Sequence, residues 1–368
     1  MLKRVVLILA VLCLVAVAPP TVQAVERPQN IILFGWDGAQ RDHVNECLSR
    51  KELPTLQKLI DQGSFVEIDV EGKTDTKAGW SQILTGCYPE VTGVYSNREY
   101  QPIPKGLTIF ERLENHFGPE RFVTVAVIGK SGHVGAAAPT KTRVKDETEE
   151  PSAKKKKKKK PQGKIIDENG IKYRVVPGQP YYLAKDNMDI FENALSKNEK
   201  VGSRTMELLE KYKDRPFFFF VHFAEPDHSG HGNGENSKEY NDGIISDDLW
   251  TGKIMQKVKE LGLAEKTQYY ITADHGFNEG ATGHSFAPYV FLATNNKKVD
   301  RNGRRQDVTP TILESFGLDL SKLSPSLDGI SLTKPDNRPP AKISPPQTRQ
   351  PAKEKSKRAK KKAARVQE

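Results

Sequence analysis

The feature that most constrains the fold of this chain is the run PFFFFVHFAE, residues Pro216–Glu225, which is apolar at nearly every position. The absence of polar alternation is typical of a β-strand that is buried on both faces of its sheet. Four other short runs are rich in β-branched or aromatic residues and are bounded by turn residues: Asn30–Gly38, Phe122–Lys130, Gln268–Gly276 and Tyr289–Asn295. We therefore expect a central sheet that is covered on both sides.

Segments with helical periodicity lie between these runs, at residues 53–63, 107–118, 202–212, 246–262 and 307–317. The alternation of strand and helix predicts an α/β fold with a mainly parallel central sheet and helices on both faces. In such sheets ligands bind beyond the carboxyl ends of the strands. Four of the five apolar runs end in a charged or imidazole group, and these groups are Asp37, Lys130, Asp227 with His231, and Asp274 with His275. We expect them to form one site.

The residues that follow the phenylalanine-rich run have the composition of a metal site. In PDHSGHGNG, Asp227 and His231 are four residues apart, and we expect Gly230 and Gly232 to let the backbone turn so that both reach one ion. Carboxylate and imidazole ligands suit zinc best, with manganese, iron or calcium as alternatives. Three aspartates and three histidines would suffice for two divalent ions, and they are Asp37, Asp227, His231, Asp274, His275 and His284.

These motifs carry a resemblance to a known family. WDG near the first strand, PDHSGHGNG, ADHG and the closing DVTPTILESFGLDL…DGISL resemble the alkaline phosphatase superfamily. More narrowly they resemble its type I phosphodiesterase/nucleotide pyrophosphatase and sulfatase-like branches. The resemblance implies that one zinc ion is held by Asp227, His231 and His284. It implies that the other is held by Asp37, Asp274 and His275, together with a nucleophilic hydroxyl.

The same resemblance indicates the nucleophile. Phosphodiesterases of this type place a threonine at a fixed interval before a TG.YPE..G segment, and Thr76 stands at that interval before Thr85, with Thr74 as the alternative. Metal coordination lowers the pKa of a hydroxyl, which is the physical reason for using a threonine. Sulfatases instead carry a CxPSR-like motif, which this segment lacks. Phosphate esters are therefore favoured over sulfate esters.

The chain also departs from the phosphodiesterase pattern. Lys77-Ala78-Gly79 follows Thr76, where the family has Phe-Pro-Asn with an asparagine that contacts phosphate. Two other residues are candidates for that contact. Asn97 falls where related enzymes carry asparagine, with a turn-capping role as the alternative. Lys130, in VIGKSGHVG, resembles the anion-binding lysine of the sulfatase GKWHLG segment and could stabilise transition-state charge.

Other histidines and tryptophans fit structural roles. His43 and His116 fall in helical stretches and are predicted to be surface residues, and His222 is predicted to be a core residue or to support a ligand. Trp36 and Trp80 either wall the pocket or pack beneath its loops.

The two ends of the chain and one insertion differ from the rest in composition. Residues 1–24 have the pattern of a secretory signal peptide, because Lys3 and Arg4 precede an apolar run that is too short to span a membrane. Residues 25–333 are expected to form one catalytic domain, interrupted by a low-complexity lysine-rich insertion at about 140–172. Residues 334–368 are expected to be a disordered basic tail. The mature protein would then be periplasmic or extracellular, with no transmembrane segment.

The net charge of +10 arises from these segments, and the remainder of the chain carries about −8. The basic tail could therefore bind an anionic surface or polyanion, although a solvated tail without a partner fits equally well. An oxidising compartment would permit Cys47 and Cys87 to pair.

The predicted function is a secreted, two-metal hydrolase of small phosphate esters, phosphodiesterase-like, acting through a threonyl-phosphate. The alternatives are a phosphomonoesterase using the same site, a sulfatase-like enzyme, and a non-catalytic polyanion-binding protein.

Overall fold

The structure is a computed structural model that describes residues 27–144 and 163–343 of the 368 residues. The predicted signal peptide, the lysine run Lys154–Lys160 and the last 25 residues of the predicted tail lie outside these ranges.

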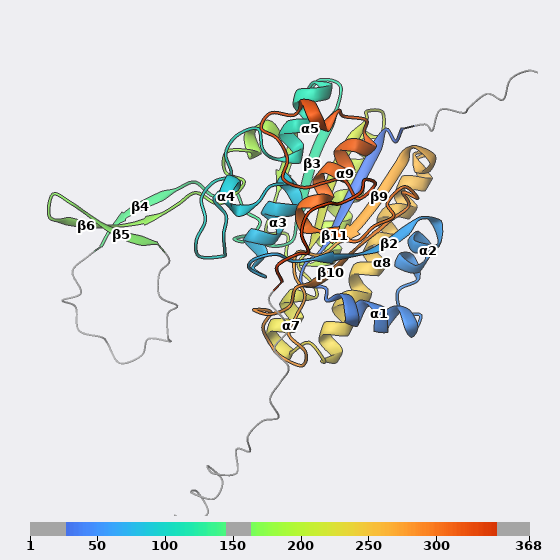
Figure 1. Cartoon of the computed structure of the whole chain (residues 1–368), viewed down its shortest axis with the longest axis horizontal. Coiled ribbons are helices and arrows are strands. Elements are labelled where there is room, and N and C mark those ends of the chain that lie inside the picture. The colour runs from blue at the N-terminus through green and yellow to red at the C-terminus, as the bar shows by residue number, and fades with distance from the viewer. Residues whose placement is uncertain (1–26, 145–162, 344–368) are drawn as a thin grey trace, which may run out of the picture.

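The core of the molecule is an eight-stranded sheet in the order β11-β2-β10-β9-β1-β8-β3-β7 (Figure 1). All five predicted strands are present and form its centre: β1 (Asn30–Trp36), β3 (Val123–Ile128), β8 (Phe217–Phe223), β9 (Thr267–Thr272) and β10 (Tyr289–Thr294). Neighbouring strands pair in parallel, except that β10 runs antiparallel to both β9 and β2. The predicted fold class is confirmed.

Three strands at the edges of this sheet were not predicted. They are β2 (Ser64–Asp69), β7 (Ile190–Glu192) and β11 (Gly303–Arg304). β2 alternates buried and exposed side chains, and the other two are only three and two residues long. None of the three therefore gives the continuous apolar run that identifies a strand with two covered faces.

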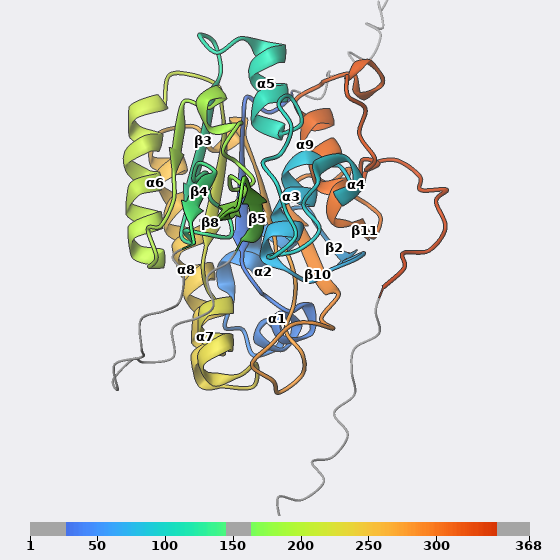
Figure 2. The same cartoon turned by 90° about the vertical axis from the view of Figure 1, so that its left-hand side faces the viewer.

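Helices cover both faces of the sheet (Figure 2). α6 and α8 pack on one face together with α1 and α2, whereas α3, α5 and α9 lie on the other. Their bounds are α1 (Arg41–Ser49), α2 (Pro54–Gln62), α3 (Thr76–Thr85), α4 (Pro89–Thr92), α5 (Ile109–Phe117), α6 (Asn198–Tyr212), α7 (Asp227–Asn233), α8 (Lys238–Glu260) and α9 (Val308–Ser315). The five predicted helices correspond to α2, α5, α6, α8 and α9.

The sheet is held by a core in which every residue of β1 and β8 is buried. Trp36 belongs to this core, and its indole N–H donates to Thr251 Oγ1 on α8 at 3.2 Å. Cys47 on α1 and Cys87 after α3 are both buried free thiols, so the two do not pair.

The insertion is more ordered at its ends than its composition indicates. β4 (Thr140–Arg143), β5 (Lys164–Glu168) and β6 (Ile171–Val176) form a separate three-stranded antiparallel sheet that projects from the domain (Figure 1). Its strands are mostly exposed, which explains why they lack an apolar signature.

The boundary expected after residue 333 also differs from the structure, because residues 334–343 pack on the domain. Arg338 donates from Nη2 to both carboxylate oxygens of the buried Asp307, at 2.8 and 2.7 Å. The Lys342 amide donates to Glu71 Oε1 at 3.0 Å. A proline-rich composition gives no indication of such contacts, since they depend on partners far away in the sequence.

Candidate active site

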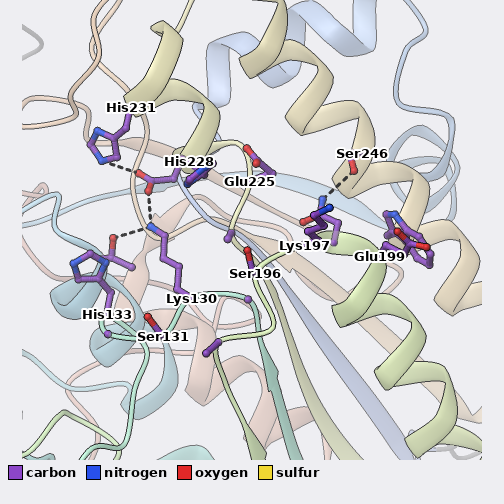
Figure 3. A pocket seen from close by; sticks show the side chains of 18 of the residues that line it. Lys130, Ser131, His133, Ser196, Lys197, Glu199, Glu225, His228, His231 and Ser246 are labelled. Carbon is purple, nitrogen blue, oxygen red and sulfur yellow. Dashed lines mark hydrogen bonds and ion pairs between the residues drawn. The ribbon is translucent and has the colours of Figure 1, made fainter.

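The side chains predicted to form a site lie together at the carboxyl ends of β1, β3, β8 and β9. Asp37 follows β1 directly, and its carbonyl accepts the amide of Asp227, which begins α7 after β8 (2.9 Å). Asp274 and His275 follow β9, and Lys130 follows β3. A cavity of about 880 Å³ opens over Thr76, Lys130, Asp227, His231 and His284 (Figure 3).

Asp37, Asp274 and His275 form an inner cluster whose potential ligand atoms lie within 4.8 Å of one another. None of the three side chains is exposed. Asp37 Oδ2 accepts from the Trp80 indole N–H at 3.2 Å and lies 2.8 Å from His222 Nε2. Trp80 and His222 therefore orient Asp37. For His222 this agrees with the prediction that it supports a ligand.

Asp227, His231 and His284 form an outer cluster with the same spacing. His231 Nε2 lies 3.4 Å from Asp227 Oδ1 and 3.2 Å from His284 Nε2. His284 arrives from the loop that precedes β10, and its Nε2 is 3.8 Å from Asp227 Oδ1. All six predicted ligands are therefore brought together in two groups of three.

The backbone around PDHSGHGNG differs from the expected flexible turn, because residues 227–233 form helix α7. Asp227 and His231 share a face because positions i and i+4 lie one helical turn apart. Gly230 is required for packing rather than for turning, since a Cβ there would lie 2.7 Å from the Phe277 ring. The prediction of a turn from the glycine content was therefore wrong, although Asp227 and His231 do lie close together as expected.

Thr76 lies beside the inner cluster at the start of α3. Its Oγ1 is 3.3 Å from His275 Nε2 and 3.4 Å from Lys130 Nζ. The alternative, Thr74, instead donates its hydroxyl to the carbonyl of His284. The geometry therefore favours Thr76 over Thr74 as the residue able to attack a substrate.

Lys130 links the two clusters. Its ammonium lies 2.6 Å from Asp37 Oδ1 and 2.5 Å from Asp227 Oδ2. Burial opposes the charge of Lys130, but Asp227 and Asp37 outweigh it and raise the lysine pKa above its ordinary value. Lys130, which was predicted as an anion-binding residue of the site, thus lies between its two clusters.

The donor set fits divalent cations. Asp227 Oδ1 and Asp274 Oδ2 are buried and have no hydrogen-bond partner among the described residues. Burial, together with the negative charge of Asp37, raises the pKa of Asp274 well above its ordinary value. Carboxylates crowded in this way require more positive charge than Lys130 supplies, and oxygen and imidazole donors suit zinc.

Asn97 lies at the rim of the same cavity. Its side-chain Oδ1 accepts the backbone N–H of Lys77 at 3.0 Å, and the backbone N–H of Asn97 donates to Asp75 Oδ2 at 2.8 Å. Since Oδ1 is occupied, the side-chain NH₂ remains as a donor for a phosphate oxygen. Lys77, which departs from the family pattern, donates from Nζ to the Asn97 carbonyl at 3.2 Å and lies over the Tyr100 ring.

One predicted surface residue is buried and takes part in supporting the site. His43 is 6% exposed, and its Nδ1 lies 2.9 Å from Glu235 Oε1. Glu235 Oε2 accepts the Gly280 amide at 2.9 Å, which fastens the loop that carries His284. Sequence reasoning missed this pair because α1 and the end of α7 are far apart in the chain. His116, by contrast, is exposed as predicted.

Comparisons with known proteins agree with this architecture. The type I phosphodiesterase/nucleotide pyrophosphatase family model matches residues 31–365. Bis(5'-adenosyl)-triphosphatase ENPP4 of Pongo abelii is 25% identical over 68% of this chain and 48% of its own length. Ectonucleotide pyrophosphatase/phosphodiesterase family member 1 of Mus musculus is 23% identical over 71% of this chain and 25% of its own. The chain thus spans a quarter to a half of these relatives.

Solved structures support the fold. An alkaline phosphatase superfamily protein from Vibrio parahaemolyticus aligns with a TM-score of 0.55 at 15% identity, over 85% of this chain and 71% of that one. The lipoteichoic acid synthase LtaP from Listeria monocytogenes aligns with a TM-score of 0.51 at 13% identity, over 83% and 75%. The family match and the shared fold confirm the resemblance found in the motifs. The chain belongs to the type I phosphodiesterase/nucleotide pyrophosphatase family and has the fold of an alkaline phosphatase superfamily protein.

Proposed function

We propose that this protein is a phosphodiesterase that uses Thr76 as its nucleophile beside two divalent metal ions, which its carboxylate and imidazole ligands identify as Zn²⁺. The observation that carries the proposal is the position of the Thr76 hydroxyl. Its Oγ1 lies 3.3 Å from His275 of the inner cluster and 3.4 Å from Lys130, which bridges both clusters.

The residues divide the reaction between them. Asp37, Asp274 and His275 would hold one ion, and Asp227, His231 and His284 the other. When bound, the ions supply Lewis-acid stabilisation of the attacking and leaving oxygens. Thr76 Oγ1 attacks phosphorus as the bond to the first alcohol breaks, the threonine proton is transferred to the departing oxygen, and the resulting threonyl-phosphate still carries the second alcohol as an ester. Water then hydrolyses this ester and regenerates the threonine. The Lys130 ammonium and the Asn97 side-chain NH₂ would contact the non-bridging oxygens, whose charge they stabilise.

The size of the cavity favours a diester over a monoester. It continues from Thr76 past Ser196 to Ser246 and Trp250. A phosphomonoester has one alcohol group, whereas a diester has two and can place one at the departing position and the other in this space. Comparing rates on bis-p-nitrophenyl phosphate, p-nitrophenyl phosphate and p-nitrophenyl sulfate distinguishes the diesterase from the monoesterase and sulfatase alternatives.

Thr76→Ala tests the nucleophile, with Thr74→Ala as the matched variant. We expect Thr76→Ala to abolish turnover while zinc content and thermal stability stay close to wild type. Thr74→Ala should remain active, and wild-type enzyme that is acid-quenched while it turns over a diester should carry the alkyl-phosphoryl group of the substrate on Thr76, assigned by fragmentation of the peptide that contains both threonines. An active Thr76→Ala protein, or phosphate on Thr74, would refute the assignment.

Removal of the ions tests the ligand assignment. Dialysis against a chelator should inactivate the enzyme, and added Zn²⁺ should restore it. Full activity in metal-free protein would contradict the two clusters as ion sites, and a stronger response to Mn²⁺ would reassign the metal.

The proposed location is outside the cytoplasm, after cleavage of the segment 1–24. Among residues 27–144 and 163–343, no helix has both the length and the apolar character needed to cross a membrane. We also propose that the basic residues after 343 attach the enzyme to an anionic surface or polyanion. We expect the full chain to bind a phosphocellulose matrix and the chain truncated after residue 343 to lose this binding. Equal retention of the two proteins would contradict the proposed attachment.

A further inference from the structure

The cavity over the catalytic residues has a second part, which the reaction itself does not use. We call it the far pocket and define it by Ser196, Lys197, Glu199, Glu225, Ser246 and Trp250. It lies between the start of α6 and the middle of α8. Figure 3 shows the Ser196 side chain between those of Lys130 and Lys197, with Ser246 beyond.

The backbone that forms one wall of the far pocket is held in an unusual conformation. Ala194 and Ser196 both adopt positive φ, 67° and 70°, although neither is glycine. The Ser196 amide donates to the Gly129 carbonyl at 2.8 Å, and the Ala194 amide to the Lys130 carbonyl at 3.3 Å. Residues kept in this region of φ/ψ space persist where the surroundings fix them, and they cluster at ligand sites. The wall is therefore fixed relative to Lys130.

The polar groups of the far pocket include both donors and acceptors. Ser246 Oγ accepts from the Asn198 side chain at 3.0 Å, so its own O–H remains as a donor. Glu225 Oε2 accepts the Ser229 amide at 3.1 Å, which leaves Oε1 as an acceptor. The Ser196 hydroxyl can do both, and Lys197 adds an ammonium donor.

This pattern selects one class of ligand. A second phosphate would place negative charge beside Glu225 and Glu199. A nucleobase needs an exposed aromatic face to stack on. Trp250, the only indole lining the described pocket, has the Lys253 ammonium 3.9 Å over its ring and packs closely against Gly202 of α6, where an added Cβ would overlap the ring. An acyl chain needs apolar walls, which serine, lysine and glutamate side chains do not provide. A ligand with neighbouring hydroxyl groups, each able to donate and to accept a hydrogen bond, complements the donors and acceptors of the far pocket.

We propose that the far pocket binds a polyhydroxylated alcohol, such as a glycerol or sugar group, as the non-reacting ester of the substrate. This inference rests on the proposed phosphodiesterase function, because it assumes that the phosphate lies at Thr76 and Lys130. It makes Ser196 and Ser246 specificity-determining residues.

The test compares four diesters that share a p-nitrophenyl leaving group. The second alcohol is methanol, glycerol, glucose through its O6, or thymidine through its O5'. We expect kcat/KM for the glycerol or glucose ester to exceed that for the methyl ester by about tenfold, from one or two added hydrogen bonds. Whichever of the glycerol and glucose esters has the higher kcat/KM shows whether the pocket prefers a glycerol or a sugar group. A thymidine ester that is hydrolysed fastest, or a ratio to methyl near one, would overturn the proposal.

Variants locate the effect. Ser196→Ala and Ser246→Ala should each reduce the ratio of hydroxylated to methyl ester by about three- to tenfold. The readout is a ratio within each variant, so any general loss of activity cancels. Ser203→Ala on α6, outside the cavity, is the matched control and should leave the ratio unchanged. An unchanged ratio in both pocket variants would also overturn the proposal.

Failure of the proposed function gives a different result, namely no hydrolysis of any of the four esters. In that case binding still tests the pocket, through calorimetric titration of zinc-loaded Thr76→Ala protein with glycerophosphoglycerol and with dimethyl phosphate. Tighter binding of the glycerol diester supports the far pocket, and equal binding refutes it.

Discussion

The inner and outer clusters offer the same kinds of ligand but are held by the protein in different ways. The candidate inner ligands follow β1 and β9, have no exposed surface, and include Asp37, which Trp80 and His222 orient. The outer ligands come from the short helix α7 and from a loop, and 48% of the His231 side chain is exposed. Because groups that orient metal ligands contribute to affinity, we expect the inner ion to be bound more tightly.

The largest expected effect is the loss of an inner ligand. Asp274→Ala should remove the inner ion and reduce turnover by at least about 10³-fold, since it removes several kcal/mol of transition-state stabilisation. Zinc content per chain and kcat are the measurements. Asp300→Ala, at an exposed aspartate, is the control. If Asp274→Ala kept both ions and its activity, the inner cluster would not be a metal site.

A smaller effect is expected at the outer cluster. His231→Ala should weaken the outer ion while the inner ion stays, and reduce turnover by about 10²-fold. Because this side chain is exposed to solvent, added imidazole should restore part of the activity. The same assay on His116→Ala, an exposed histidine of α5, should show no change. Loss of both ions in His231→Ala would show that the two clusters are not independent.

This difference also decides what the sequence could predict. The inner ligands follow continuous apolar strands, and those strands were predicted with nearly correct bounds, so Asp37, Asp274 and His275 could be placed at one edge of the sheet. Asp227 and His231 were predicted as ligands from their spacing, and His284 from the family resemblance, but the local structure of residues 227–233 was not predicted. Three glycines in nine residues indicated a turn, whereas the packing of Gly230 against Phe277 stabilises a helix there.

The supports of the site could not be predicted, because they depend on burial that arises only in the folded chain. His43 and Glu235 are 192 residues apart, and neither belongs to an apolar run that would mark it as buried. The side-chain orientation of Asn97 depends on the backbone N–H of Lys77, a contact between the start of α3 and a later loop that no sequence pattern indicates. The far pocket depends on the conformation of Ser196, which no sequence pattern indicates.

Glu235 tests whether the outer cluster is limited by its loop. Glu235→Gln should weaken the hydrogen bond to the Gly280 amide and the pairing with His43, and thereby loosen the loop that carries His284. We expect the affinity of the outer ion to fall by about tenfold, the usual size of such indirect effects. The control is Glu239→Gln at an exposed position of α8. An unchanged zinc affinity would mean that α7 alone fixes the outer site.

The smallest expected effect is a pH dependence of stability that originates at His43. Burial opposes its charge, but the neighbouring Cys47 thiol and the Glu235 carboxylate, which pairs with Nδ1, outweigh burial and raise the pKa of His43 to about 10. A raised pKa in the folded state means that the stabilisation is complete below the ordinary value of 6.5 and is lost as pH rises through about 10. Wild-type protein should therefore lose thermal stability between pH 7 and pH 10 relative to His43→Gln, which has no titrating ring. Melting curves of the two proteins at matched ionic strength give this difference directly. Parallel melting temperatures across that range would show that His43 is neutral, and the loop of the outer cluster would then be fastened by Glu235 through the Gly280 amide alone.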